Sequence, residues 1–223
     1  MRLRLPLFPP ISTLSFALLP CAFVAAGCGS DGMKAAVPPA MHGSSGFETS
    51  AEGWTITGDA QTSHVEPDYN GQGGNPDGLI SAVDDVTGGV WYFQAPAKYL
   101  GDASATYGRY LDFDLKTNAI SSPFDSFDVA LVGAGITLGF DVPMNPVVDV
   151  WTSFRVKLDE TAGWRVTDTV SESAFGDFAT LPAPTADQMK AALGNLTQLL
   201  IRGEFQDGAD TGYLDNVRFG AAP

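Results

Sequence analysis

Hydrophobic and polar residues alternate along several segments of this 223-residue chain. In 111–116, Leu111, Phe113 and Leu115 are separated by charged residues. The same period recurs in 127–131, 154–158, 199–205 and 217–219. A period of two sends one set of side chains into a core and the other into water, as in antiparallel sheets. Stacking two such sheets buries both apolar faces. The pattern therefore predicts an all-β fold, an antiparallel two-sheet β-sandwich of jelly-roll type.

One segment departs from this period and predicts a short helix over 186–193. Thr185 is a good N-cap, and Gln188 three residues later completes a capping-box pattern. Met189 and Leu193 then recur at helical spacing, and Gly194 can end the helix. We expect this helix to lie across one end of the sandwich.

An aromatic run occupies the middle of the chain. Trp91-Tyr92-Phe93-Gln94-Ala95-Pro96 is followed by Tyr99-Leu100-Gly101-Asp102, by Tyr107-Gly108 and by Leu111-Asp112-Phe113-Asp114-Leu115. Near the end stand Leu200-Ile201-Arg202-Gly203-Glu204-Phe205 and Leu214-Asp215-Asn216-Val217. Together these segments resemble the laminin IV type A module, also called the laminin B domain.

This resemblance implies an extracellular β-sandwich without enzymatic activity. In laminins the module interrupts cysteine-rich repeats, which this chain lacks, so basement-membrane assembly does not carry over. The implied fold is also similar in outline to galactose-binding domains and carbohydrate-binding modules. What the resemblance implies is the fold and a general role in extracellular recognition.

Charge and cysteine content narrow the class of partner. The formal net charge is -14, which repels phosphate backbones and disfavours nucleic acid. It also disfavours electrostatic docking on anionic lipid. The two cysteines, Cys21 and Cys28, lie in the first 30 residues. The folded part is therefore predicted to hold neither a disulfide nor a thiolate metal site.

The N-terminal segment resembles a lipoprotein leader. Arg2 and Arg4 precede an apolar stretch that is too short and broken to span a membrane. Small residues then precede Cys28, as in a bacterial lipobox, which predicts lipidation of Cys28 and an outer-membrane or cell-surface location. Ordinary cleavage near Ala26 and secretion is the alternative. We expect residues 1–27 as signal peptide, 28–46 as a Gly/Ser/Ala/Pro tether with an inert His42, and 47–220 as the sandwich.

Acidic residues around the first and last strands predict a structural calcium site. Carbohydrate-binding jelly rolls often fix their first strand, an early loop and their last strand with one Ca²⁺, which takes several oxygen ligands. The predicted ligands are Glu48, Asp77, Asp84 and Asp215, with Asp85 as a further possibility. The alternative is that these acids are turn formers and solvated charges.

Aromatic side chains near loops are candidates for sugar binding, which combines aromatic planes with polar groups. Tyr69, Tyr92 and Tyr99 are the predicted ligand-binding residues, with Tyr92 pointing outward from its strand. The tryptophans Trp54, Trp91, Trp151 and Trp164 are expected in the core.

No catalytic residue is predicted. In the folded part only His64 could serve as an imidazole base, and no serine has a nucleophile-elbow pattern. The sequence thus favours a non-catalytic recognition module of the cell envelope that binds a glycan or extracellular polymer, with membrane contact through the lipid anchor only. A structural envelope or matrix protein that binds other proteins is the first alternative. A glycan hydrolase is the second.

Overall fold

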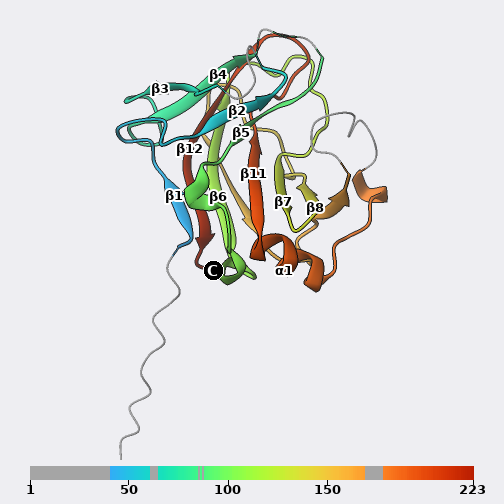
Figure 1. The fold of residues 1–223 in the computed structure, drawn as a ribbon. Helices are drawn as coiled ribbons and strands as arrows, with labels where there is room; N and C mark the ends of the chain where they lie inside the picture. Colours follow the sequence, from blue (N-terminus) through green and yellow to red (C-terminus); the bar gives the residue numbers. More distant parts are fainter. Residues whose placement is uncertain (1–40, 61–64, 85, 87, 169–177) are drawn as a thin grey trace, which may run out of the picture. The chain divides into compact units, whose positions relative to one another are not determined.

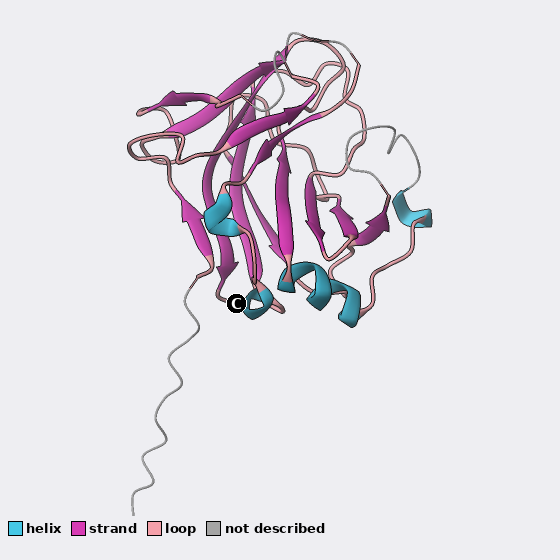
Figure 2. Ribbon diagram, viewed as in Figure 1, coloured by secondary structure: helices cyan, strands magenta, loops and turns pink. Residues whose placement is uncertain are grey.

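The computed structural model describes residues 41–60, 65–84, 86, 88–168 and 178–223, and they belong to one compact unit. Two six-stranded antiparallel sheets form the predicted β-sandwich (Figure 1). The first sheet has the order β3-β4-β12-β6-β9, with β1 also paired to β12. The second has the order β10-β8-β7-β11-β5-β2. Figure 2 shows how strongly strands outweigh helices.

The strands of the first sheet are β1 (Gly43–Ser45), β3 (Asp68–Asn70), β4 (Leu79–Asp84), β6 (Tyr110–Thr117), β9 (Thr152–Lys157) and β12 (Asp210–Ala221). Those of the second are β2 (Thr55–Gly58), β5 (Trp91–Gln94), β7 (Val129–Gly133), β8 (Ile136–Phe140), β10 (Arg165–Thr167) and β11 (Leu196–Arg202). Helix α1 (Ala186–Gly194) packs against β7 and β8. Its capping box between Thr185 and Gln188 is confirmed, and the helix is one residue longer than predicted.

The main core lies between the two sheets, as the alternation predicts. Leu111, Phe113 and Leu115 of β6 point into it, as do Val156 of β9 and Ile201 of β11. Burying such aliphatic and aromatic side chains is the main favourable contribution to folding. The inward faces of β6 and β9 therefore hold the first sheet in place, and their polar residues remain on its outer face.

The outer face of the second sheet is also covered, which corrects the expectation that one face of each strand meets water. Tyr92 and Leu200 join Val90 and Ala130 in a second apolar cluster, against which Phe124 packs. On the same side, Arg202 is buried and places its guanidinium over the Phe124 ring, 4.6 Å from the centroid. The segment that precedes β7 thus shields the centre of this sheet.

The folded part begins before residue 47, inside the segment expected to be a tether. β1 pairs with β12 in the register Gly43↔Phe219 to Ser45↔Val217, and His42 packs edge-on against Phe219 with ring centroids 5.7 Å apart. A Cβ at Gly43 would lie 2.8 Å from the Tyr99 ring. Close packing requires a glycine at this position. Gly43, which the sequence assigned to the tether, therefore belongs to a strand.

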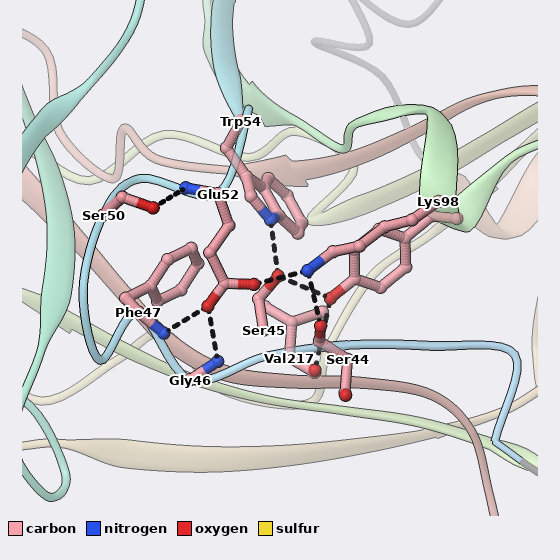
Figure 3. A network of polar contacts seen from close by, with 10 residues as sticks. Ser44, Ser45, Gly46, Phe47, Ser50, Glu52, Trp54, Lys98 and Val217 are labelled. Atoms are coloured by element: carbon pink, nitrogen blue, oxygen red, sulfur yellow. Dashed lines mark hydrogen bonds and ion pairs between the residues drawn. The ribbon is translucent and has the colours of Figure 1, made fainter.

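Hydrogen bonds fix β1 to the rest of the sandwich (Figure 3). The Ser45 hydroxyl accepts from Trp54 Nε1 and from the Tyr99 hydroxyl, each at 2.9 Å. Glu52 accepts from the Phe47 backbone at 2.8 Å and is paired with Lys98. The buried polar groups of this first strand are therefore satisfied, which an unstructured tether would not require.

A glycine of the inner layer gives a test of this packing. A Cβ at Gly203 would lie 2.0 Å from two carbons of the buried Trp91 ring. Gly203→Ala should therefore lower the free energy of unfolding by about 1–3 kcal/mol or more. A Cβ at Gly194, the last residue of α1, meets nothing within 4 Å. Gly194→Ala should leave stability unchanged or raise it by up to about 1 kcal/mol, because alanine favours helix. Urea unfolding of both variants measures the difference, and equal stabilities would contradict the packing.

Candidate functional site

A groove of about 370 Å³ crosses the outer face of the first sheet. It is lined by residues of β6, β9 and β12 and by part of the loop that precedes β4: Asn75, Pro76, Asp112, Phe113, Asp114, Ser153, Phe154, Arg155, Asn216 and Arg218. The side chains on the outer face follow from the alternation, because their neighbours Phe113 and Phe154 point into the core. A rigid sheet therefore positions the floor of the groove.

One wall of the groove is the covering loop, which we define as residues 71–78. The Asn75 backbone N–H donates to Asp215 Oδ2 at 2.6 Å, and Asn75 Nδ2 donates to Asp114 Oδ2 at 3.1 Å. In return, Asn216 Nδ2 donates to the Asn75 carbonyl. Farther along the loop, Trp151 Nε1 donates to the Gly73 carbonyl at 3.0 Å. The covering loop is thus attached to β6, β12 and the start of β9.

Asp215 anchors this loop from beneath. It is 0 % exposed, and a Cβ at Gly74 would lie 2.8 Å from its Oδ2 and 2.0 Å from the Gly78 carbonyl, so the loop needs a glycine there. Burial raises the pKa of Asp215 to about 6, opposed by backbone donors from Asn75 and Asn216 and reinforced by the charges of Asp114 and Glu48. Several carboxylates are therefore gathered where a proton or a cation lowers their repulsion.

The opposite part of the groove carries an exposed ion pair. Arg155 donates from Nε to Asp112 Oδ1 at 2.8 Å and from Nη2 to Asp112 Oδ2 at 2.9 Å. The same guanidinium lies over the Tyr110 ring, 4.8 Å from its centroid. A two-pronged pair stacked on an aromatic ring has a fixed orientation. Arg218 is exposed beside it, and no ion pair within the described part of the chain engages it.

Trp151 lies on the same outer face, not in the core as predicted. Lys116 stands between the two rings of Trp151 and Tyr213, at 4.8 Å and 4.5 Å from their centroids. Trp151 directly precedes the edge strand β9, so its indole is only half-buried. The other three tryptophans are fully buried, as predicted.

The structure separates the predicted calcium ligands. Glu48 and Asp215 are close enough for their charges to interact, and Asp77 belongs to the covering loop. Asp84 is opposite Asp210 in the β4–β12 register, five residues along β12 from Asp215 and about 17 Å away. The set therefore cannot act as one site, and Asp85 lies outside the described residues. Within the described ranges, no three His, Cys, Asp or Glu side chains are grouped as metal ligands.

The predicted ligand-binding tyrosines are placed differently from one another. Tyr69 is 40 % exposed, and its hydroxyl donates to the Glu48 carbonyl at 3.0 Å. Tyr92 is 1 % exposed, and burial raises its pKa to about 12 despite a hydrogen bond with Ser126 at 3.1 Å. Tyr99 is 0 % exposed and bonds to Ser45. The prediction is wrong for Tyr92 and Tyr99, which are inaccessible to a surface ligand.

The main groove residues, Asp112, Arg155, Asn216 and Arg218, were not singled out by sequence. Alternation placed Asp112 and Arg155 on a polar face, but it gives no signal that a loop distant in the sequence forms a wall over that face. Cys28 and His64 lie outside the described residues. Within the described part of the chain, no helix is both long and apolar enough to cross a membrane.

Comparison with known proteins gives a family match over more than half of the chain. The family model described as Laminin B (Domain IV) matches residues 92–223. Human laminin subunit gamma-1 is 28% identical over 131 residues, which cover 59% of this chain and 7% of that protein. The laminin-like protein lam-2 of Caenorhabditis elegans is 30% identical over 147 residues, covering 63% and 8%. The chain thus spans a tenth or less of the length of these curated relatives.

Two solved structures are also similar. The L4b domain of human laminin alpha-2 matches with a TM-score of 0.49 at 12% identity, covering 63% of this chain and 81% of that one. The family 11 carbohydrate-binding module from Clostridium thermocellum, solved in complex with a β-1,3-1,4-mixed-linked tetrasaccharide, matches with a TM-score of 0.45 at 10% identity, covering 80% and 94%.

Proposed function

This chain belongs to the Laminin B (Domain IV) family, and from that premise we propose that it is a non-catalytic recognition module of an exported protein. Its ligand is a glycan, which binds in the groove on the outer face of the first sheet. The observation that carries the proposal is the Asp112–Arg155 pair that lines this groove, with the Arg155 guanidinium held over the ring of the neighbouring Tyr110.

The chemistry of the groove suits a sugar. Saccharides combine hydroxyl groups, which need fixed donors and acceptors, with apolar ring faces, which pack on aromatic side chains. The groove offers a carboxylate and a guanidinium held in one orientation, together with the amide of Asn216. Because these groups are already ordered, binding loses little side-chain entropy.

The same hydrogen bonds disfavour hydrolysis. A glycosidase needs two carboxyl groups that can act on the scissile bond as acid and as base or nucleophile. Both groove carboxylates have structural partners: Asp112 binds Arg155, and Asp114 accepts from Asn75 and Asn216. Asp215 is fully buried beneath the covering loop. The groove thus fits binding better than turnover.

Binding to a glycan array, followed by calorimetry on the best ligand, tests the groove. Arg155→Ala should weaken binding at least tenfold, which is about 1.4 kcal/mol, because it removes donors and frees Asp112. Arg165→Ala, on β10 of the other sheet, is the control and should bind like the unchanged protein. Absence of any glycan ligand, with capture of specific proteins instead, would favour the structural alternative. Equal binding by both variants would place the glycan elsewhere.

We further propose that a calcium ion is held near Asp215 and Glu48, with carbonyl oxygens of the covering loop as additional ligands. Support comes from the buried negative charge of Asp215, which is close to Glu48 and Asp114. Oxygen ligands of this kind suit Ca²⁺. The ion would fix the covering loop before a glycan arrives.

Calcium should accordingly raise the melting temperature, and EDTA should reverse the rise. Ligand binding to the folded state alone stabilises it in proportion to the logarithm of ligand concentration. Asp215→Asn should abolish the shift, whereas Asp187→Asn, on the exposed side of α1, should retain it. A melting curve that calcium and EDTA leave unchanged in the wild type rules the ion out.

We also propose that the protein is exported and anchored through a lipid on Cys28. The support is the sequence of small residues before this cysteine. Cells grown with labelled palmitate should label the wild type but not Cys28→Ser, because the thioether linkage needs the thiol. Equal labelling of both proteins, or of neither, leaves plain signal cleavage as the explanation.

A further inference from the structure

Arg218, which lines the groove, is the exception among the basic side chains of the structure. The other lysines and arginines of the described ranges each bind an acid, a carbonyl oxygen or an aromatic ring: Lys98, Arg109, Lys116, Arg155, Lys157, Arg165, Lys190 and Arg202. Among the residues that the structure describes, none forms a hydrogen bond, ion pair or ring contact with the Arg218 side chain. Acidic residues outnumber basic ones by 26 to 12, so a shortage of acids does not explain this.

A β-bulge turns the Arg218 side chain onto the outer face of the first sheet. Between Asp215 and Arg218, three steps along β12 match two steps along β6. Asn216 lies in this bulge with a φ of 53°, in the left-handed region that asparagine enters more readily than most residues. Unbroken alternation after Asp215 would have placed Val217 on the outer face. The bulge instead sends Val217 into the core and Arg218 into the groove.

The cross-strand neighbours of Arg218 do not balance its charge. On β6 it is opposite Asp112, but both oxygens of that carboxylate already accept from Arg155, at 2.8 Å and 2.9 Å. On β1 it is opposite Ser44, which carries no charge. The row of side chains that crosses the sheet here thus contains two guanidinium groups and one carboxylate. One positive charge of this row is left for a ligand.

The other carboxylate that lines the groove does not fill this role. Asp114 is only 7 % exposed, and its Oδ2 accepts from Asn75 at 3.1 Å and from Asn216 at 2.8 Å. It is therefore held by the covering loop and by the bulge, whereas Arg218 is exposed. A ligand in the groove reaches the guanidinium more readily than this carboxylate.

We propose that the glycan bound in the groove is acidic, and that the carboxylate of one of its sugar units, a hexuronic acid, pairs with Arg218. A guanidinium presents parallel N–H donors that match the two oxygens of a carboxylate. The Asp112–Arg155 pair and the Asn216 amide then remain for the uncharged hydroxyl groups. This inference rests on the proposed glycan-binding function and names the class of its ligand, with Arg218 as the residue that determines specificity.

The charges around the groove favour an isolated carboxylate over a densely sulfated chain. The formal net charge of the protein is -14, and Asp112, Asp114 and the buried Asp215 are all close to the groove. These acids repel any ligand charge that has no cation of its own. Among the described residues that line the groove, Arg218 is the one cation without an acidic partner. We therefore expect uronic acids separated by neutral sugars.

The test uses oligosaccharides that contain glucuronic, galacturonic, mannuronic or guluronic acid. Each is paired with its carboxyl-reduced counterpart, in which the same sugar carries a CH2OH group, and sulfated oligosaccharides complete the panel. Calorimetry on the full chain should find at least one acid form that binds at least tenfold more tightly than its reduced counterpart. Added salt should narrow this difference, because it screens exposed charges.

Two variants then locate the preference. Arg218→Gln should bring the affinities of the acid and reduced forms close to each other and leave the affinity of the reduced form unchanged. Arg165→Gln removes the same charge from β10 of the other sheet and should keep the preference for the acid form. A merely structural role of Arg218 would weaken both forms equally. Melting temperatures confirm that both variants are folded.

The possible results separate this inference from the proposed function. Suppose that a glycan binds and that Arg155→Ala weakens it. Equal affinity for the acid and reduced forms, an unchanged preference in Arg218→Gln, or tighter binding of sulfated than of uronic acid oligosaccharides would then overturn the inference and leave glycan binding in place. Failure of every glycan to bind, acidic or neutral, would instead contradict the proposed function itself.

Discussion

The attachment of a loop to a buried carboxylate determines the shape of the outer face of the first sheet. Asp215 accepts the Asn75 backbone N–H at 2.6 Å and is fully enclosed by the chain that it holds. Without this contact, β6, β9 and β12 would present an open sheet. With it, the same strands form the floor of a walled groove. One arrangement therefore has two effects. Burial of Asp215 under the loop raises the pKa of its carboxyl group, and the same loop forms the wall of the groove.

The two sheets use their outer faces differently. On the second sheet, Phe124, Tyr92 and Arg202 fill the space over β5, β7 and β11, so these strands are buried on both sides. On the first sheet, polar pairs such as Asp112–Arg155 remain at the surface. The buried acids Asp84, Glu204 and Asp210 lie near the start of β12. Exposed polar side chains therefore collect on one face of the sandwich, and buried acids collect at one rim.

Much of this arrangement follows from local pattern. The alternation of 111–116 and 154–158 placed their inward and outward side chains correctly, and the Thr185–Gln188 capping box located α1. Local pattern failed where distant segments decide burial. Tyr92 alternates like a surface residue, but the segment around Phe124 covers it. Asp84 and Asp215 were predicted to share a calcium ion because carbohydrate-binding jelly rolls often join an early loop to the last strand, and only the β4–β12 register shows their separation. Gly43 resembles a linker residue in sequence. Its structural role is to have no side chain where the Tyr99 ring packs against the strand, and composition alone does not reveal that role.

The pairing of β1 with β12 has a mechanical consequence. Gly43 lies beside Phe219 in an antiparallel pair, so the polypeptide enters and leaves the domain at neighbouring points. Tension applied across those two points would open the pair like a zipper, breaking one hydrogen bond at a time, instead of shearing all of them together.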